Sequence, residues 1–274
     1  MYCDLLVHVD GSPAGRRRVR FAADLSLRTG ARLAGLHVTP PVEVPPLYKP
    51  SRVPDIAAKI AARLVSDARA AAAIFKEETA QHPTEASWHE MRGDVVQGIT
   101  DCARYADLVI VGQYEWQGSP VVHPLPIAHS VALHCGRPVL VVPADPKSNP
   151  LKTIAIAWDG SREAVRAIHD ALPLLLLSQS VQIVAIAALT AESSAADAKS
   201  LAEHLTNHGI KVGIQIVRST KVEEHATLRK QIAQGHYDLL VMGGYSNPAW
   251  LQFLFGGATQ SILLSSAIPV LVSH

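Results

Sequence analysis

The chain has 274 residues, a length that exceeds one average domain and fits two domains of roughly 130 to 140 residues. Hydrophobic residues make up 48% of the sequence, charged residues 18% and aromatic residues only 5%, a composition typical of parallel sheets covered by helices. The formal net charge of +1 provides no global field that would attract nucleic acid or an anionic membrane, so we expect neither partner.

Short apolar runs alternate with Ala-rich stretches along the whole chain. In the first half the pattern predicts strand 5–9, helix 14–29, strand 33–38, helix 56–81, strand 84–91, helix 95–105, strand 108–111, helix 127–135 and strand 139–142. In the second half it predicts strands 154–157, 181–187, 212–217, 239–242 and 270–272. Strands that alternate with helices in this way predict parallel, doubly wound sheets with right-handed crossovers.

Three motifs occur twice, and the second copy follows the first by 149 positions early in each half and by 131 positions later. The pairs are Asp10-Gly11-Ser12 with Asp159-Gly160-Ser161, residues 107–112 (Asp-Leu-Val-Ile-Val-Gly) with 238–243 (Asp-Leu-Leu-Val-Met-Gly), and residues 138–142 with 269–273. The repeat indicates that the two halves share one fold.

The fall from 149 to 131 means that the first half carries 18 additional residues between its second and fourth strands. Residues 39–56 hold six prolines, a density that excludes a regular helix and favours an extended excursion. A surface loop and a lid over a site are both open interpretations. We predict a first domain at 1–144 with this Pro-rich insertion, and a second domain at 151–274.

The repeated motifs resemble those of the universal stress protein family: a first strand that ends in Asp-Gly-Ser, a fourth strand Asp-Leu-Leu-Val-Met-Gly, and a closing Pro-Val-Leu-Val. The chain looks like a tandem two-domain member. The resemblance implies two tandem doubly wound parallel five-stranded sheets of the Rossmann-like, adenine-nucleotide alpha hydrolase-like type. In this family the closing strands pair between partners, which implies an internal pseudo-dimer formed through 139–142 and 270–272. A further homodimer stays open.

Family members that bind ATP carry Gly-x-x-Gly-x9-Gly-Ser/Thr after the fourth strand. The second half keeps this spacing with Gly243, Ser246, Gly256 and Gly257, although Ser246 replaces the second glycine and Gly257 replaces the hydroxyl residue. Glycines let the backbone approach a phosphate, and N–H groups at the start of the next helix bind its charge. Because residues 243–257 contain no Lys or Arg, we expect weak binding of ATP or another adenine nucleotide.

The resemblance also assigns Asp159 to the ribose and the backbone of Ala187 to the adenine. Both positions follow strands at the carboxyl edge of the predicted sheet, where open parallel sheets bind ligands. An alternative is that Asp159-Gly160-Ser161 only turns the chain and caps the next helix. We predict no metal site, apart from a magnesium ion that a nucleotide would carry.

The equivalent loop of the first half is predicted to be disabled. Glu115 stands opposite Ser246, and Leu125 and Pro126 stand opposite the paired glycines of the second half. Pro126 removes an N–H group, and Glu115 adds negative charge. We interpret this half as a structural pseudo-copy.

Enzyme signatures are not found in the sequence. There is no Walker loop, no Gly-x-Gly-x-x-Gly after a strand and no Gly-x-Ser-x-Gly elbow around Ser130 or Ser161. We therefore predict a non-catalytic stress-response module. The alternative is a structural or interaction module with decayed nucleotide sites that binds a hydrophobic ligand or a protein partner, because residues 250–255 concentrate apolar and aromatic side chains.

Cysteine and histidine spacing favours neither disulfides nor metal. Three cysteines without a Cys-x-x-Cys pair suggest no disulfide framework. His123, His129 and His134 lack the i, i+4 spacing that would place ligands on one helical face. The sequence shows no export signal and no apolar run of the roughly 20 residues that span a membrane, so we expect a cytoplasmic protein.

Overall fold

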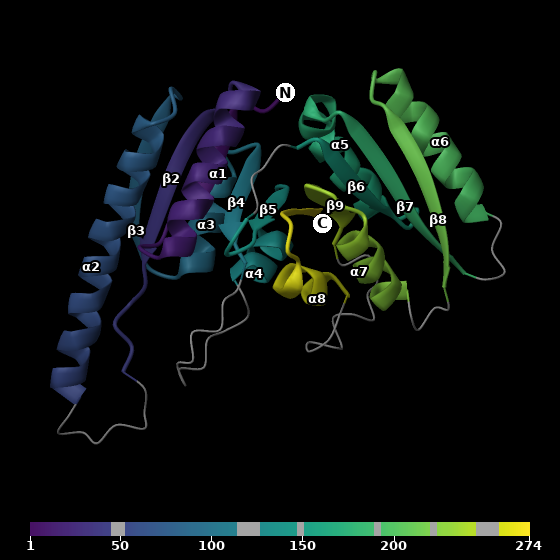
Figure 1. Ribbon diagram of the computed structural model, residues 1–274. Coiled ribbons are helices and arrows are strands. Elements are labelled where there is room, and N and C mark those ends of the chain that lie inside the picture. The colour runs from purple at the N-terminus through teal and green to yellow at the C-terminus, as the bar shows by residue number, and fades with distance from the viewer. Residues whose placement is uncertain (45–52, 114–126, 147–150, 189–192, 220–223, 245–257) are drawn as a thin grey trace. The chain divides into compact units, whose positions relative to one another are not determined.

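A computed structural model of the chain describes residues 1–44, 53–113, 127–146, 151–188, 193–219, 224–244 and 258–274 (Figure 1). Strands and helices alternate throughout these residues, as the sequence predicts. The chain divides into two compact units, one of residues 2–137 and the other of residues 138–274 with Met1.

The unit of residues 2–137 contains, in its described part, four parallel strands in the order β3-β2-β1-β4. Its elements are β1 (Asp4–His8), α1 (Pro13–Thr29), β2 (Arg32–Thr39), α2 (Val53–Ala80), β3 (Ala86–Arg92), α3 (Val95–Ala103), β4 (Leu108–Gly112) and α4 (Ile127–His134). Helices α1 and α2 contact each other, and so do α3 and α4. Strand residues such as Val7 and Ile110 are fully buried, which explains why these strands read as continuous apolar runs.

The unit of residues 138–274 has the strand order β5-β10-β9-β6-β7-β8. Its elements are β5 (Val139–Val142), β6 (Thr153–Trp158), α5 (Arg162–Leu177), β7 (Ser180–Ala188), α6 (Ser193–Asn207), β8 (Val212–Ser219), α7 (Glu224–Gln234), β9 (Leu239–Gly243), α8 (Ala258–Ser265) and β10 (Val270–Ser273). Strands β10, β9, β6, β7 and β8 form the predicted five-stranded parallel sheet.

Strand β5 belongs to the first half by sequence but is grouped by its contacts with the second unit. It runs antiparallel to β10, with Val141 opposite Val270 and Val139 opposite Val272. The pairing predicted for the two closing strands is therefore present. All residues of both strands are buried.

The Asp-Gly-Ser motif builds the same helix start in both halves. The Ser12 hydroxyl accepts a hydrogen bond from the Gly15 N–H (2.9 Å), and the Ser161 hydroxyl accepts one from the Ala164 N–H (3.1 Å). These serines are the N-caps of α1 and α5. The predicted capping role of the motif is thus confirmed, and it leaves a second role of the aspartates open.

The aspartate before the fourth strand of each half fastens the start of the first strand. One carboxylate oxygen of Asp107 accepts hydrogen bonds from the N–H groups of Cys3 (2.6 Å) and Asp4 (3.0 Å). Asp238 does the same for Lys152 (2.8 Å) and Thr153 (3.0 Å). The repeated aspartate therefore has a structural explanation in both copies.

We expect Asp238→Ala to lower the free energy of unfolding by about 1–2 kcal/mol, because two N–H groups at the sheet edge lose a charged acceptor. Urea denaturation at neutral pH measures this loss. Asp238→Asn is the control, since its amide oxygen still accepts both hydrogen bonds, and it should cost less than half as much. Equal losses for the two variants would contradict the assignment.

Candidate functional site

The carboxyl edge of β6 and β9 is the switch point of the second unit. The two strands are neighbours, with Ile156 opposite Val241. After β6 the chain continues to β7 on one side of this pair, and after β9 it continues to β10 on the other side. Open parallel sheets bind ligands at such points. Asp159 follows β6, and Gly243 ends β9, so the fold brings these two predicted residues to one edge.

Ala187 lies near the end of the next strand, β7, where its backbone pairs with Arg218 of β8. The other predicted site residues, Ser246, Gly256 and Gly257, lie outside the described residues. The same holds for residues 250–255 and for most of the Pro-rich insertion, whose last residues form the start of α2.

Asp159 is exposed, and only one of its two carboxylate oxygens takes part in the start of helix α5. Its Oδ1 accepts hydrogen bonds from the Ser161 N–H (3.0 Å) and hydroxyl (2.6 Å). In the described part of the chain, Oδ2 has no hydrogen-bond or ion-pair partner. This oxygen can accept hydrogen bonds from hydroxyl groups of a ligand without breaking a contact of the fold.

Gly243 is required by close packing. A Cβ atom at this position would lie 2.5 Å from the backbone nitrogen of Ala164 and 2.7 Å from the carbonyl carbon of Glu163. The end of β9 therefore rests directly on the first turn of α5. Its glycine has a structural explanation that does not depend on a ligand.

Two basic residues near this edge were not anticipated from the loop sequence. Arg162 begins α5, and its Nε donates to the buried Glu163 carboxylate (2.5 Å), a hydrogen bond that lowers the pKa of Glu163. His274 Nδ1 lies 3.1 Å from the carbonyl oxygen of Gly244, and the Gly244 N–H donates to Ser273 (2.8 Å). In the sequence, only the position of Arg162 directly after Asp-Gly-Ser indicates that a basic residue lies near this edge.

The equivalent edge of the first unit is closed by a buried arginine. Arg18 of α1, whose side chain is 5% exposed, donates from Nη2 to Asp10 Oδ2 (2.7 Å) and from Nε to the His8 carbonyl oxygen (2.7 Å). Ser12 donates to the other oxygen of Asp10 from both its N–H and its hydroxyl. Burial would raise the pKa of Asp10, but the Arg18 charge and these hydrogen bonds hold it well below its usual range.

The guanidinium of Arg18 lies against the end of β4. A Cβ atom at Gly112 would come within 2.0 Å of its Nη1, so the glycine that corresponds to Gly243 makes room for a side chain of its own unit. Ala167 occupies the corresponding position of α5, 149 residues after Arg18. Helix α2 adds Asp67, whose Oδ1 accepts a hydrogen bond from the Gly11 N–H (2.9 Å).

Two histidines complete this closed edge. Burial, followed by the nearby Arg18 charge, lowers the pKa of His8 to about 3, so its imidazole is neutral at physiological pH. The buried His37 donates from Nδ1 to the Val9 carbonyl oxygen (2.9 Å). Glu115, Leu125 and Pro126, which predict a disabled loop here, lie outside the described residues.

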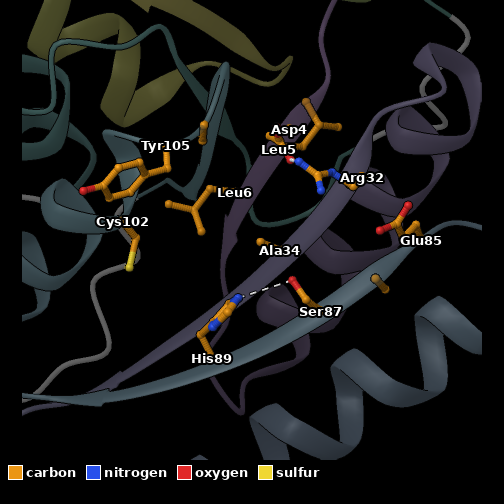
Figure 2. A pocket seen from close by; sticks show the side chains of 12 residues that line it. Asp4, Leu5, Leu6, Arg32, Ala34, Glu85, Ser87, His89, Cys102 and Tyr105 are labelled. Atoms are coloured by element: carbon orange, nitrogen blue, oxygen red, sulfur yellow. Dashed lines mark hydrogen bonds and ion pairs between the residues drawn. The ribbon is translucent and has the colours of Figure 1, made fainter.

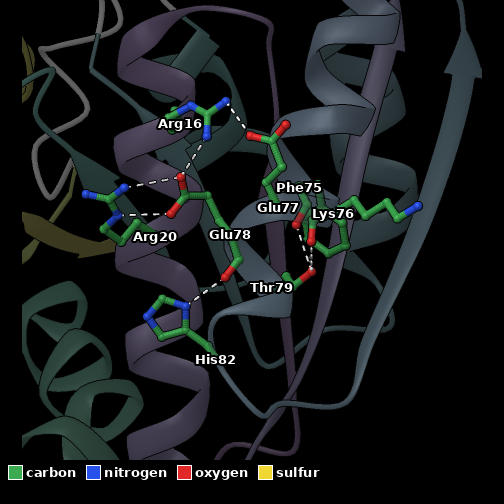
Figure 3. A network of polar contacts seen from close by, with 8 residues as sticks. All are labelled: Arg16, Arg20, Phe75, Lys76, Glu77, Glu78, Thr79 and His82. Carbon is green, nitrogen blue, oxygen red and sulfur yellow. Dashed lines mark hydrogen bonds and ion pairs between the residues drawn. The ribbon is translucent and has the colours of Figure 1, made fainter.

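Figure 3 shows how two other basic residues of α1, Arg16 and Arg20, are held. Arg16 (3.0 Å) and Arg20 (2.9 Å) both donate to the Glu78 carboxylate of α2, whose side chain is fully buried. Burial would raise the pKa of Glu78, but these hydrogen bonds lower it below its usual value. Arg18 is thus buried, whereas Arg16 and Arg20 keep partly exposed side chains (40% and 55%) and pair with Glu78.

The structure adds two observations on metals and membranes. Within the described ranges, no group of three or more His, Cys, Asp or Glu side chains is arranged to hold a metal ion. His129 and His134 lie on and at the end of α4, and His123 is outside these ranges. No helix in the part of the chain that can be described is long and apolar enough to cross a membrane.

Comparison with known proteins follows the same division of the chain. The sequence matches the universal stress protein family over residues 1–143 and again over residues 150–274. No curated protein matches it. A universal stress protein structure from Archaeoglobus fulgidus DSM 4304 is similar, with a TM-score of 0.72, 16% identity, and coverage of 98% of this chain and 95% of that chain.

A second similar structure is a candidate universal stress protein from Pseudomonas aeruginosa UCBPP-PA14. Its TM-score is 0.58 at 13% identity, and the alignment covers 99% of this chain and 93% of that chain. A functionally unknown protein from Pseudomonas aeruginosa PAO1 gives 0.56 at 13% identity, with 99% and 92% covered. At these identities the likeness shows a shared fold over nearly the whole chain.

Proposed function

The chain belongs to the universal stress protein family, and from this premise we propose that it is a non-catalytic stress-response module whose second half binds an adenine nucleotide weakly. Nucleotide binders exist among such proteins, since one solved structure is a universal stress protein in complex with cAMP. The observation that carries the proposal is the contrast between the two aspartates of the repeated Asp-Gly-Ser motif.

Both carboxylate oxygens of Asp10 are bound by side chains or backbone of the first unit, whereas Asp159 keeps one oxygen available for a ligand. Asp10 is paired with Arg18 and Ser12, so a ligand that approached it would have to displace a buried ion pair. Asp159 is exposed and has Ala167 where the first half has Arg18. We propose that Asp159 Oδ2 accepts hydrogen bonds from the ribose hydroxyls and that the backbone near Ala187 meets the adenine.

The phosphates would be held by the backbone of the loop that follows β9, with Gly243, Ser246, Gly256 and Gly257 as the contributing positions. No Lys or Arg lies between residues 243 and 257. The loss of one charge-assisted hydrogen bond, about 1.5–3 kcal/mol, weakens binding roughly ten- to a hundredfold. A magnesium ion would come with the nucleotide rather than from ligands of the protein.

Binding rather than turnover fits the side chains near Asp159. The Ser161 hydroxyl donates to Asp159 and accepts from the Ala164 N–H, so it is committed to the helix start. The His169 ring lies 5.5 Å from the ring of His204, on the side of α6. These contacts do not pair a nucleophile with a base.

We expect calorimetric titration with MgATP to give one weak site per chain that Asp159→Ala weakens about tenfold or more, because the ribose hydroxyls lose a charged acceptor. Asp94→Ala is the matched control, since Asp94 is an exposed N-cap aspartate of the first unit. It should leave ATP binding unchanged.

The absence of heat up to millimolar ATP would refute nucleotide binding and favour the alternative, an interaction module with decayed sites. Equal ATP affinity in Asp159→Ala and the wild type would refute the placement of the ribose. Native mass spectrometry of the purified chain separates the same two functions, because a bound nucleotide and a lipid-like or protein mass are distinguishable.

A further inference from the structure

A cavity of about 380 Å³ opens beside the sheet of the first unit, between α3 and β3 (Figure 2). Leu6, Ala34 and Ser87 lie side by side in register across β1, β2 and β3 and form its floor. The end of α3 and the following turn line one side, and His89 lines the other. The cavity is lined at the amino ends of the strands, away from the edge that holds Asp10.

The internal repeat identifies the corresponding place in the second unit. Ala106 precedes Asp107 as Tyr237 precedes Asp238. Strand register gives the other equivalences, because Leu5 lies opposite Leu33 as Ile154 lies opposite Val181. The residues that correspond are Ala34 with Gln182, Ser87 with Gly213, His89 with Gln215, and Ala106 with Tyr237.

In the second unit this place is filled by side chains of the protein itself. Tyr237 is buried, and its hydroxyl donates to Gln215 Oε1 (3.4 Å). Its ring folds over Gly235, where a Cβ atom would lie 1.9 Å from the ring, whereas Arg104 stands at the corresponding position of the first unit. The Gln182 amide lies against Gly213, 2.6 Å from where a Cβ would be. The second unit thus fills with a phenol side chain and an amide the place that corresponds to the open cavity of the first unit.

We propose that the cavity of the first unit binds a neutral monocyclic phenol, with its ring beside Ala106, within the hollow that Tyr237 and Gln182 fill in the second unit, and its hydroxyl hydrogen-bonded to His89. His89 takes the place of Gln215, which receives the Tyr237 hydroxyl in the second unit. The His89 imidazole contacts the Ser87 hydroxyl (3.3 Å), so both polar groups face the same side of the cavity.

Other properties of the cavity favour this class of ligand. Its volume lies within the range of about 300–1,000 Å³ typical of small-molecule sites. Leu6 and Ala34 offer an apolar floor, and Tyr105, 84% exposed, stands at the rim where its ring can pack on a ligand. At the same rim Arg32 is paired with the Asp4 carboxylate (2.6 Å) and Glu85 adds a negative charge, so the rim offers no net positive charge to an anion such as benzoate.

Covalent capture of the ligand is not part of the proposal. Burial, with a smaller effect of Asp101, raises the pKa of the Cys102 thiol. The thiol therefore stays protonated near neutral pH, and it points its hydrogen toward the sulfur of Met91 (3.6 Å).

The test is calorimetric titration of the full chain with 4-methylphenol. We expect one site in the wild type and at least a tenfold loss of affinity in Arg104→Gly/Ala106→Tyr, which supplies the missing ring together with the glycine over which it packs. Ala34→Gln fills the cavity from the other side and should weaken binding as well, so the test survives if one variant fails to fold. Tyr237→Ala empties the second hollow and should raise the stoichiometry from one phenol to two.

The hydroxyl is tested separately with toluene, which has the ring but no hydrogen-bonding group. The wild type should prefer 4-methylphenol over toluene several-fold, and His89→Leu should abolish this preference. No binding of 4-methylphenol at millimolar concentration, or unchanged affinity in both Arg104→Gly/Ala106→Tyr and Ala34→Gln, would overturn the proposal. An unchanged preference in His89→Leu would overturn the assignment of the hydroxyl.

Discussion

Asp10→Ala is expected to lower the free energy of unfolding by about 2–4 kcal/mol, because it leaves the Arg18 guanidinium buried without its counter-charge. The Arg18 side chain is 5% exposed and that of Asp10 is 35% exposed, so the loss should stay below the largest values known for buried pairs. Urea denaturation at pH 7, followed by circular dichroism, measures the change.

Asp159→Ala provides a control at the same position of the repeat. It removes the same acceptor of the serine hydroxyl but no ion pair, so we expect a loss of only about 0.5–1 kcal/mol. Adding Arg18→Met to Asp10→Ala should recover part of the lost stability, because no unpaired charge is then buried. Similar losses for the two alanine variants would show that Arg18 does not depend on Asp10.

The stability of the chain is expected to fall as the pH decreases below about 6.5, with His8 contributing up to about 1.4 kcal/mol per pH unit. The unfolded chain binds a proton at His8 in this range, whereas burial lowers the folded-state pKa to about 3. Protons therefore favour the unfolded state. Between pH 6 and pH 4.5 this amounts to about 2 kcal/mol.

His8→Ala should reduce this pH dependence. Alanine is chosen because the second half has Ala157 at the matching position. The quantity compared between variant and wild type is the slope of the free energy of unfolding against pH, not the free energy itself. Asp10 and Arg18 remain as the charged groups near this position, and His37 as the other titratable one. The low pKa of Asp10 affects stability mainly below its unfolded value of about 3.9, so it contributes little between pH 6 and pH 4.5. An unchanged slope in His8→Ala would disprove the assignment.

Most strands and helices could be predicted from the sequence because the parallel strands are buried on both faces. Strand 108–111, for example, is β4 without its final glycine. The ends of elements were less predictable, since α2 starts at Val53, inside the segment whose prolines argue against a regular helix. Proline is tolerated in the first turn of a helix, where its missing N–H has no partner to lose.

The closed edge of the first unit could not be predicted from local sequence. Arg18 stands among three other arginines at the start of α1, and that spacing alone indicates a solvated face. Its burial depends on Asp10, on Gly112 and on the His8 carbonyl, which tertiary structure brings together. A comparison of Arg18 with Ala167 across the repeat was the one available signal.

Because β5 pairs with β10, the segment that is repeated in the sequence and the segment that packs as one compact unit have different boundaries. A fragment that starts at the repeat boundary, residues 151–274, would lack β5 and leave β10, with its apolar Val270, Leu271 and Val272, as a bare edge strand. Such edges recruit other chains and promote aggregation. A fragment of residues 138–274 keeps β5 paired with β10, so its sheet ends at β5 instead. The repeated segment, which starts at residue 151, is thus thirteen residues shorter than the segment that packs as one unit, which starts at residue 138.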